Sequence, residues 1–142
     1  MKIQPFEIAI PQAAPDDLHQ RLSRTRWPDE IPGSEWNYGS NLTYMKDLIR
    51  YWQTPFDWRS REHMINTFAH FRTTIDGMNI HFLHARGNRP HPIPLLLTHG
   101  WPSSFVEMLK ILPRLTDPAH YGGNPADAFD VNANAYLDHP SI

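Results

Sequence analysis

The apolar positions in the first seventy residues follow the spacing of helices separated by short breaks. An alternating segment at residues 6–10 has the period of a strand. A helix is then predicted from Pro15 to Trp27, where a following proline ends it. Asn41 and Asp57 are suitable N-caps for two further helices. The apolar residues at helical spacing are Leu18, Leu22, Leu42, Met45, Leu48, Ile49, Trp52, Ile65 and Phe68.

Beyond residue 70 the apolar period changes from helical to two. The segments 71–75 and 78–83 flank an Asp-Gly pair at 76–77, which accepts the positive φ angles of a type I′ turn, so a β-hairpin is predicted. The uniformly apolar segment 93–98 is typical of a buried central strand. Residues 129–131 resemble the first residues of another strand.

A loop and a helix follow the segment 93–98. Ser104 and Glu107 form a capping box for a predicted helix. The apolar stripe of this helix is Phe105, Met108, Leu109 and Leu112. A buried strand that runs through a glycine-containing loop into a helix places backbone N–H groups at the sheet edge, where anions and oxyanions bind. The residues at this point are His99-Gly100-Trp101-Pro102. They are also compatible with a tight strand-to-helix turn that has no chemical role.

Composition narrows the classes of function. The chain has 142 residues, which is the size of one domain. Its 13 Lys and Arg against 15 Asp and Glu leave no basic surplus, so neither nucleic acid nor an anionic membrane is an expected partner. The absence of cysteine excludes disulfides, thiolate nucleophiles and zinc–thiolate sites. With no long apolar segment and no signal peptide, a cytoplasmic location without a membrane segment is expected.

No metal or cofactor is expected. His81 and His84 are three apart on a predicted strand and therefore face opposite sides, while His63 and His70 are separated by two helical turns. Neither pair has the spacing of metal ligands. The acidic residues of the last third are interpreted as caps and solvated turn residues, namely Asp117, Asp127 and Asp130.

Several motifs together resemble a known enzyme family. His99-Gly100-Trp101-Pro102-Ser103-Ser104-Phe105, after an apolar strand, resembles the His-Gly-x-Pro oxyanion loop of α/β-hydrolase epoxide hydrolases. The stretch from Pro5 to Leu115, about four fifths of the chain, is similar to the amino-terminal region of the microsomal-type epoxide hydrolases. The other matching motifs are Arg24-Thr25-Arg26-Trp27-Pro28, Trp36-Asn37-Tyr38-Gly39, Leu42 with Tyr44, Tyr51-Trp52, Phe56-Asp57-Trp58-Arg59, Ile75-Asp76-Gly77 and Ile80-His81-Phe82.

The resemblance implies an α/β fold with a helical meander, a β-hairpin and the first strand–loop–helix of an α/β-hydrolase domain. Residues 1–115 are then the amino-terminal region with the opening of the hydrolase core, and 116–142 hold a loop, a partial strand and a divergent tail after Val131. The family adds water to a small-molecule epoxide through an aspartyl ester and yields a vicinal diol. The resemblance assigns oxyanion stabilisation to the backbone N–H of Trp101, with its indole placed to line the substrate pocket.

The same resemblance gives His99, Gly100 and Pro102 the role of shaping the loop. It also exposes a departure, because no glycine of the chain belongs to a Gly-x-Asp-x-Gly or Gly-x-Ser-x-Gly nucleophile elbow. In this fold the nucleophile, acid and histidine all follow the oxyanion loop. The chain is therefore expected to be a truncated, inactive part of an epoxide hydrolase. Two alternatives remain open: a stand-alone interaction or regulatory module, and complementation by a second polypeptide. Self-association through exposed apolar surface is also expected.

Overall fold

The structure is a computed structural model that describes residues 2–136. Residues Ala9–Arg61 form one compact unit, and the remaining described residues form the other. Within the described residues there are four α-helices, three short 3-10 helices and one five-stranded sheet. The observed class is mixed α/β, as the sequence predicts.

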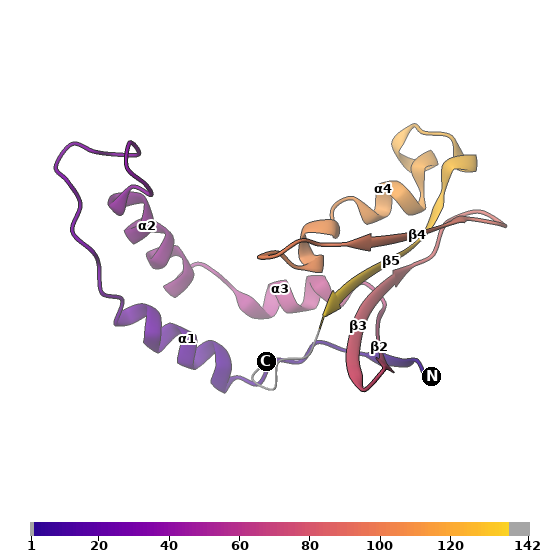
Figure 1. The fold of residues 1–142 in the computed structure, drawn as a ribbon, viewed down its shortest axis with the longest axis horizontal. Helices are drawn as coiled ribbons and strands as arrows, with labels where there is room; N and C mark the ends of the chain where they lie inside the picture. The colour runs from indigo at the N-terminus through magenta and orange to yellow at the C-terminus, as the bar shows by residue number, and fades with distance from the viewer. Residues whose placement is uncertain (1, 137–142) are drawn as a thin grey trace. The chain divides into compact units, whose positions relative to one another are not determined.

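The first unit is built from α1 (Ala13–Ser23), α2 (Leu42–Gln53) and the start of α3 (Trp58–Ile65) (Figure 1). The predicted caps are confirmed for two of these helices. The Asn41 side chain accepts a hydrogen bond from the Tyr44 N–H at 2.9 Å, and the Asp57 carboxylate accepts one from the Ser60 N–H at 3.2 Å. Helix α1 ends at Ser23, four residues before Trp27, where the sequence predicts its end.

The second unit contains the sheet, whose strand order is β1-β2-β3-β5-β4 (Figure 1). The strands are β1 (Gln4–Phe6), β2 (His70–Ile75), β3 (Met78–Ala85), β4 (Ile93–Thr98) and β5 (Phe129–Tyr136). The hairpin of β2 and β3 is confirmed, and its turn residues Asp76 and Gly77 have φ angles of 52° and 81°. β5 pairs antiparallel with β3 and parallel with β4. The strand predicted at 129–131 therefore continues to Tyr136.

The strand predicted at residues 6–10 is wrong in its position. β1 covers only Gln4–Phe6, paired antiparallel with β2. Just beyond it, the Ile8 N–H donates to the Asn66 Oδ1 at 3.0 Å, and the Asn66 Nδ2 donates to the Ile8 carbonyl at 2.7 Å. An asparagine side chain thus takes both backbone groups of Ile8. Because the strand ladder needs those groups, the pairing ends before this residue.

The prediction that 93–98 forms a central strand is also wrong for the described sheet. β4 lies at its edge and pairs with β5 alone among the described strands. Its apolar residues differ in environment, because Leu95 and Leu97 pack against the core while Leu96 is 66% exposed. Alternate residues of a strand point to opposite faces, and only one face of β4 meets the described core.

The single helix predicted after Ser104 is divided in two. A 3-10 helix, η1 (Phe105–Met108), is followed by α4 (Leu112–Thr116). Pro113 explains the break, since it has no N–H to donate to the carbonyl of Leu109, which lies between the two helices. The predicted apolar stripe nevertheless packs inward. Two short 3-10 helices, η2 (Pro118–Tyr121) and η3 (Pro125–Asp127), lead to β5.

One hydrophobic cluster forms the core of the sheet-containing unit. Its buried members come from α3, β3, the η1–α4 segment and β5, and they are Ile65, Leu83, Leu109, Leu112, Val131 and Ala133. The helical segments that follow β4 thus pack on the same sheet face as the residues of β3 and β5. This packing determines where the loop between β4 and η1 begins and ends.

We expect Leu112→Ala to lower the free energy of unfolding by about 2–5 kcal/mol, because Leu112 is fully buried and its loss leaves a cavity. Leu96→Ala is the matched control and should change it by less than about 0.5 kcal/mol, since this leucine is exposed. Urea unfolding followed by circular dichroism measures both. Equal effects of the two substitutions would contradict the assigned core.

Candidate functional site

The four residues that the sequence singles out form one loop at the carboxyl end of β4. The strand ends at Thr98, and His99, Gly100, Trp101 and Pro102 follow before Ser104 caps η1. In the parallel register of β4 and β5, Thr98 lies opposite Asn134. The structure therefore brings the predicted residues together at the sheet edge where the sequence places them.

The loop is closed around the carbonyl of Gly100. The Ser103 N–H donates to this oxygen at 2.8 Å, and the His99 Nδ1–H donates to it at 3.2 Å. The Trp101–Pro102 peptide bond is cis. His99 thus contacts the loop backbone through its ring nitrogen.

Trp101 is the exposed residue of the loop. Its side chain and backbone together are 96% accessible, and its N–H donates no hydrogen bond to any residue within 2–136. A backbone N–H without an intramolecular partner is available to an external acceptor. The loop consequently presents one free donor and one large aromatic ring.

The helix that follows contributes less than the sequence predicts. The Ser104 hydroxyl accepts a hydrogen bond from the Val106 N–H at 3.3 Å, so the capping role of Ser104 is confirmed. However, η1 has only four residues, which is too few to sum a substantial helix dipole. Any anion stabilisation at this point must come from the N–H groups of the loop.

Two buried histidines lie next to η1, and their spacing in the sequence does not indicate that they pair. His70 and His81 are 4% and 2% exposed, and the His70 Nδ1 is 3.0 Å from the His81 Nε2. The His70 Nε2 is 2.9 Å from the Ile65 carbonyl. A carbonyl only accepts hydrogen bonds, so the His70 Nε2 carries the proton in this contact. In neutral His70 the Nδ1 is then the acceptor, and the His81 Nε2–H donates to it.

Aromatic rings enclose this pair. The Phe105 ring lies edge-on to both imidazoles, with centroids 5.7 Å from His70 and 5.1 Å from His81. The Phe6 ring contacts His81 at 5.3 Å, and the guanidinium of Arg72 lies 3.7 Å from the centroid of Phe6. Burial first, and then the neighbouring His70 and Arg72, lower the pKa of His81 from 6.5 to about 4.

A second contact between polar side chains links His84 of β3 to Asp130 of β5. The Asp130 carboxylate accepts from the His84 Nε2–H at 3.2 Å and from the Gly87 N–H at 3.2 Å. Although desolvation acts in the opposite direction, these hydrogen bonds and the positive charges of His84 and Arg86 lower the pKa of Asp130. Asp130 therefore joins two strands, and its interpretation as a solvated turn residue is wrong.

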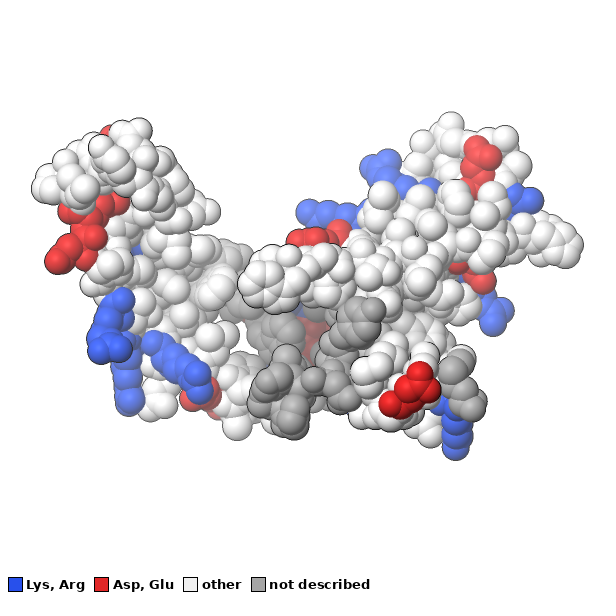
Figure 2. All heavy atoms as spheres, viewed as in Figure 1, with Lys and Arg blue, Asp and Glu red and all other residues white. Residues whose placement is uncertain are grey.

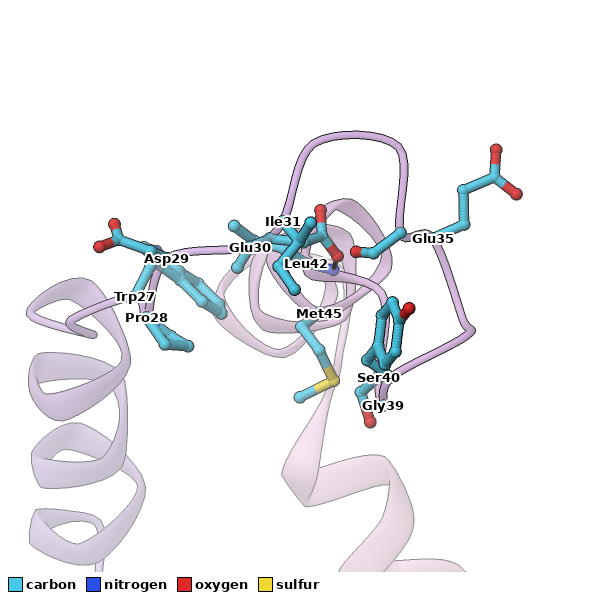
Figure 3. Close-up of a pocket in the computed structure, with 12 residues that line it drawn as sticks. Trp27, Pro28, Asp29, Glu30, Ile31, Glu35, Gly39, Ser40, Leu42 and Met45 are labelled. Atoms are coloured by element: carbon cyan, nitrogen blue, oxygen red, sulfur yellow. Dashed lines mark hydrogen bonds between the residues drawn. The ribbon is translucent and has the colours of Figure 1, made fainter.

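Outside this loop, the helical unit contains a pocket of about 400 Å³ between residues 27 and 45 (Figure 3). Three carboxylates line it. That of Glu30 accepts the Leu42 N–H at 2.9 Å, and the Glu35 side chain points away from Met45 in Figure 3. These carboxylates do not converge on one point, so the pocket is not a cation site of the kind that needs several oxygen ligands.

The distribution of charge, the hydropathy of the helices and the grouping of metal-ligating side chains each add one finding. Figure 2 shows Lys and Arg in small groups among Asp and Glu on the visible face, with uncharged surface between them. No helix within residues 2–136 is long and apolar enough to cross a membrane. In the same part of the chain, no three His, Asp or Glu side chains are grouped so that they could hold a metal ion.

Comparison with known proteins shows that the chain is similar to epoxide hydrolases. The family model described as "Epoxide hydrolase N terminus" matches residues 3–108. The protein named "Putative epoxide hydrolase" in Stigmatella aurantiaca (strain DW4/3-1) is 49% identical over 129 residues, which cover 91% of this chain and 29% of that protein. Epoxide hydrolase 1 of Oryctolagus cuniculus is 39% identical over 133 residues, with the same coverage of both chains.

A solved structure agrees with the fold. The Aspergillus niger epoxide hydrolase superposes on 95% of this chain with a TM-score of 0.80 and 28% identity, over 35% of its own length. The chain thus spans less than a third of the two relatives above and about a third of this structure. The match includes the mixed α/β architecture with its five-stranded sheet.

The His70–His81 pair predicts a dependence of stability on pH. Between pH 6.5 and about 4, His81 is protonated to a greater extent in the unfolded state than in the folded state. Its contribution to the free energy of unfolding is therefore complete above pH 6.5 and decreases as the pH falls through this window. At 1.36 kcal/mol per pH unit of pKa difference, the loss is roughly 3 kcal/mol. Urea unfolding at several pH values measures it.

In His81→Gln this part of the pH dependence should disappear, because the amide group replaces the donor without titrating in that range. His91→Gln, at an exposed position, is the matched control and should retain it. The assignment is contradicted if His81→Gln and the unmodified chain lose the same free energy of unfolding between pH 6.5 and 4.

Proposed function

This chain belongs to the epoxide hydrolase N-terminus family, and we propose that it supplies the amino-terminal region and the oxyanion loop of an enzyme that hydrolyses small-molecule epoxides. The observation that supports this proposal most strongly is the Trp101 N–H, which has no partner within residues 2–136 and lies in a loop at the carboxyl end of β4. A developing oxyanion requires a hydrogen-bond donor that has no other partner, and this N–H at the carboxyl end of β4 is such a donor.

Each residue of the loop has a proposed role in epoxide hydrolysis. In the reaction an aspartate opens the epoxide and forms an ester, and water then attacks the ester carbonyl, whose oxygen gains negative charge. The Trp101 N–H donates to that oxygen, and one such donor contributes roughly 2.7–4 kcal/mol to the transition state. His99, Gly100 and Pro102 hold the turn that presents it, partly through the His99 contact to the Gly100 carbonyl.

The nucleophile, acid and base must come from outside these residues. No nucleophile elbow is present in the 142-residue sequence, and the chain spans about 29% of the relatives it matches. We infer that the chain alone does not hydrolyse epoxides, and that the missing groups are supplied by the remaining part of an epoxide hydrolase. A cytoplasmic location, without nucleic acid as a partner, belongs to the same proposal.

A chimeric enzyme tests this function. Residues 3–136 of this chain replace the matching region of the Stigmatella aurantiaca relative, and conversion of styrene oxide to its diol is measured. We expect activity in the chimera and none in the 142-residue chain. An inactive chimera that is folded, as judged by circular dichroism, would count against the proposal, provided that the unmodified relative is active.

The donor itself is tested by two changes in this chimera. Replacement of Trp101 by its α-hydroxy acid analogue converts the Gly100–Trp101 amide into an ester and removes only the N–H. The expected loss in kcat is about 10²- to 10³-fold. Trp101→Ala keeps the N–H and should lose far less. If the alanine variant loses as much as the ester variant, the indole rather than the backbone donor is responsible.

An apolar edge supports a second, non-catalytic proposal, that the chain self-associates. β4 pairs with β5 alone among the described strands, and Ile93 and Leu96 are 46% and 66% exposed. Exposed apolar edge strands pair with other chains. Light scattering after size exclusion should show oligomers that Leu96→Lys reduces and that Ile75→Lys, on the hairpin, does not. Monomers of the unmodified chain at all concentrations would contradict self-association.

A further inference from the structure

The buried histidine pair contacts the segment that carries the loop. Phe105 is the first residue of η1 and directly follows Ser104, which caps η1 at the end of the loop. Its ring lies edge-on to both imidazoles, at interplanar angles of 76° to His70 and 66° to His81. The position of the loop's last residues is therefore tied to the two strands of the hairpin.

We propose that His70 and His81 are positioning residues for the loop: their hydrogen-bonded rings fix Phe105, and Phe105 fixes where the Trp101 N–H is presented. The assignment rests on the proposed function of the loop. Neither histidine touches the reacting atoms. They act through Phe105 and through the start of η1.

The pair is suited to this role because it is anchored at both ends. His70 donates to the carbonyl of Ile65, the last residue of α3, and accepts from His81 on the neighbouring strand. Arg72 lies directly opposite His81 in the hairpin register, and Leu83 lies directly opposite His70. The two imidazoles therefore occupy the sheet face that carries the core residue Leu83, and they have little freedom to rotate.

Several charged side chains stand on the elements packed against the pair. Arg72 of β2 lies directly opposite His81, Glu62 is a buried residue of α3, and Glu107 is an exposed residue of η1. A proton on His81 would place a charge beside Arg72 and under Phe105. This charge should move Phe105 and, with it, the loop.

The experiment is a nuclear magnetic resonance titration of the full 142-residue chain. The backbone amide resonances of Gly100, Trp101 and Ser103 are followed from pH 7.5 to below the His81 pKa of about 4, together with the imidazole resonances of His81. We expect the loop amides to shift in the same transition as the His81 ring. Loop amides that stay constant while the His81 ring titrates would overturn the proposal.

Two variants at pH 7.5 separate positioning from general stability. His81→Leu removes the donor to His70 and should shift the loop amides, whereas His81→Gln retains a donor and should restore them. The proposal fails if the two variants give the same loop spectrum. If His81→Leu does not fold, the comparison of His81→Gln with the unmodified chain across the titration remains decisive, because the loop transition should then be lost.

This readout does not require epoxide hydrolysis. A chimera without activity would count against the proposed function and leave the coupling of the loop to His81 measurable. Conversely, an active chimera with loop amides that ignore the titration of His81 would retain the proposed function and remove the positioning role.

Discussion

The pairing of β5 with both β3 and β4 is the interaction on which the rest of the sheet-containing unit depends. β4 has no other strand partner within residues 2–136, so its position relative to the hairpin is determined by a strand that begins 31 residues after Thr98. Val131 and Ala133 of β5 then complete the core against which the η1–α4 segment packs. This arrangement determines the positions of the two ends of the loop between β4 and η1, because both flanking elements pack against the same core.

Local signals predicted much of the fold, and long-range pairing explains what they missed. The Asp76–Gly77 turn and the Asn41 cap are decided by a few neighbouring residues, and both were predicted. The apolar character of 93–98 indicated a strand but could not indicate an edge, since edge or centre depends on which strands pair. Ile8 was assigned to a strand because the side chain that takes its backbone groups, Asn66, lies 58 residues away.

In the candidate site, too, features set by neighbouring residues were predicted from the sequence, and features set by long-range pairing were not. His99 to Pro102 are consecutive, so a motif was enough to find them, whereas the unpartnered Trp101 N–H is visible only in the folded loop. His70 and His81 were considered only with neighbours in sequence. The hairpin register contained the missing signal, because a turn at 76–77 places Arg72 opposite His81 and His70 two residues further along the same face. Sequence spacing alone does not reveal a diagonal contact between strands.

The proposed role of the loop is to stabilise an oxyanion during hydrolysis of an ester, and the rate of that hydrolysis tests this role most directly. In the chimera, rapid quenching after a single turnover separates formation of the aspartyl ester from its hydrolysis. With the Gly100–Trp101 amide converted to an ester, hydrolysis of the intermediate should slow by about 10²- to 10³-fold, and the covalent intermediate should accumulate. An unchanged rate of hydrolysis would contradict the role assigned to the Trp101 N–H.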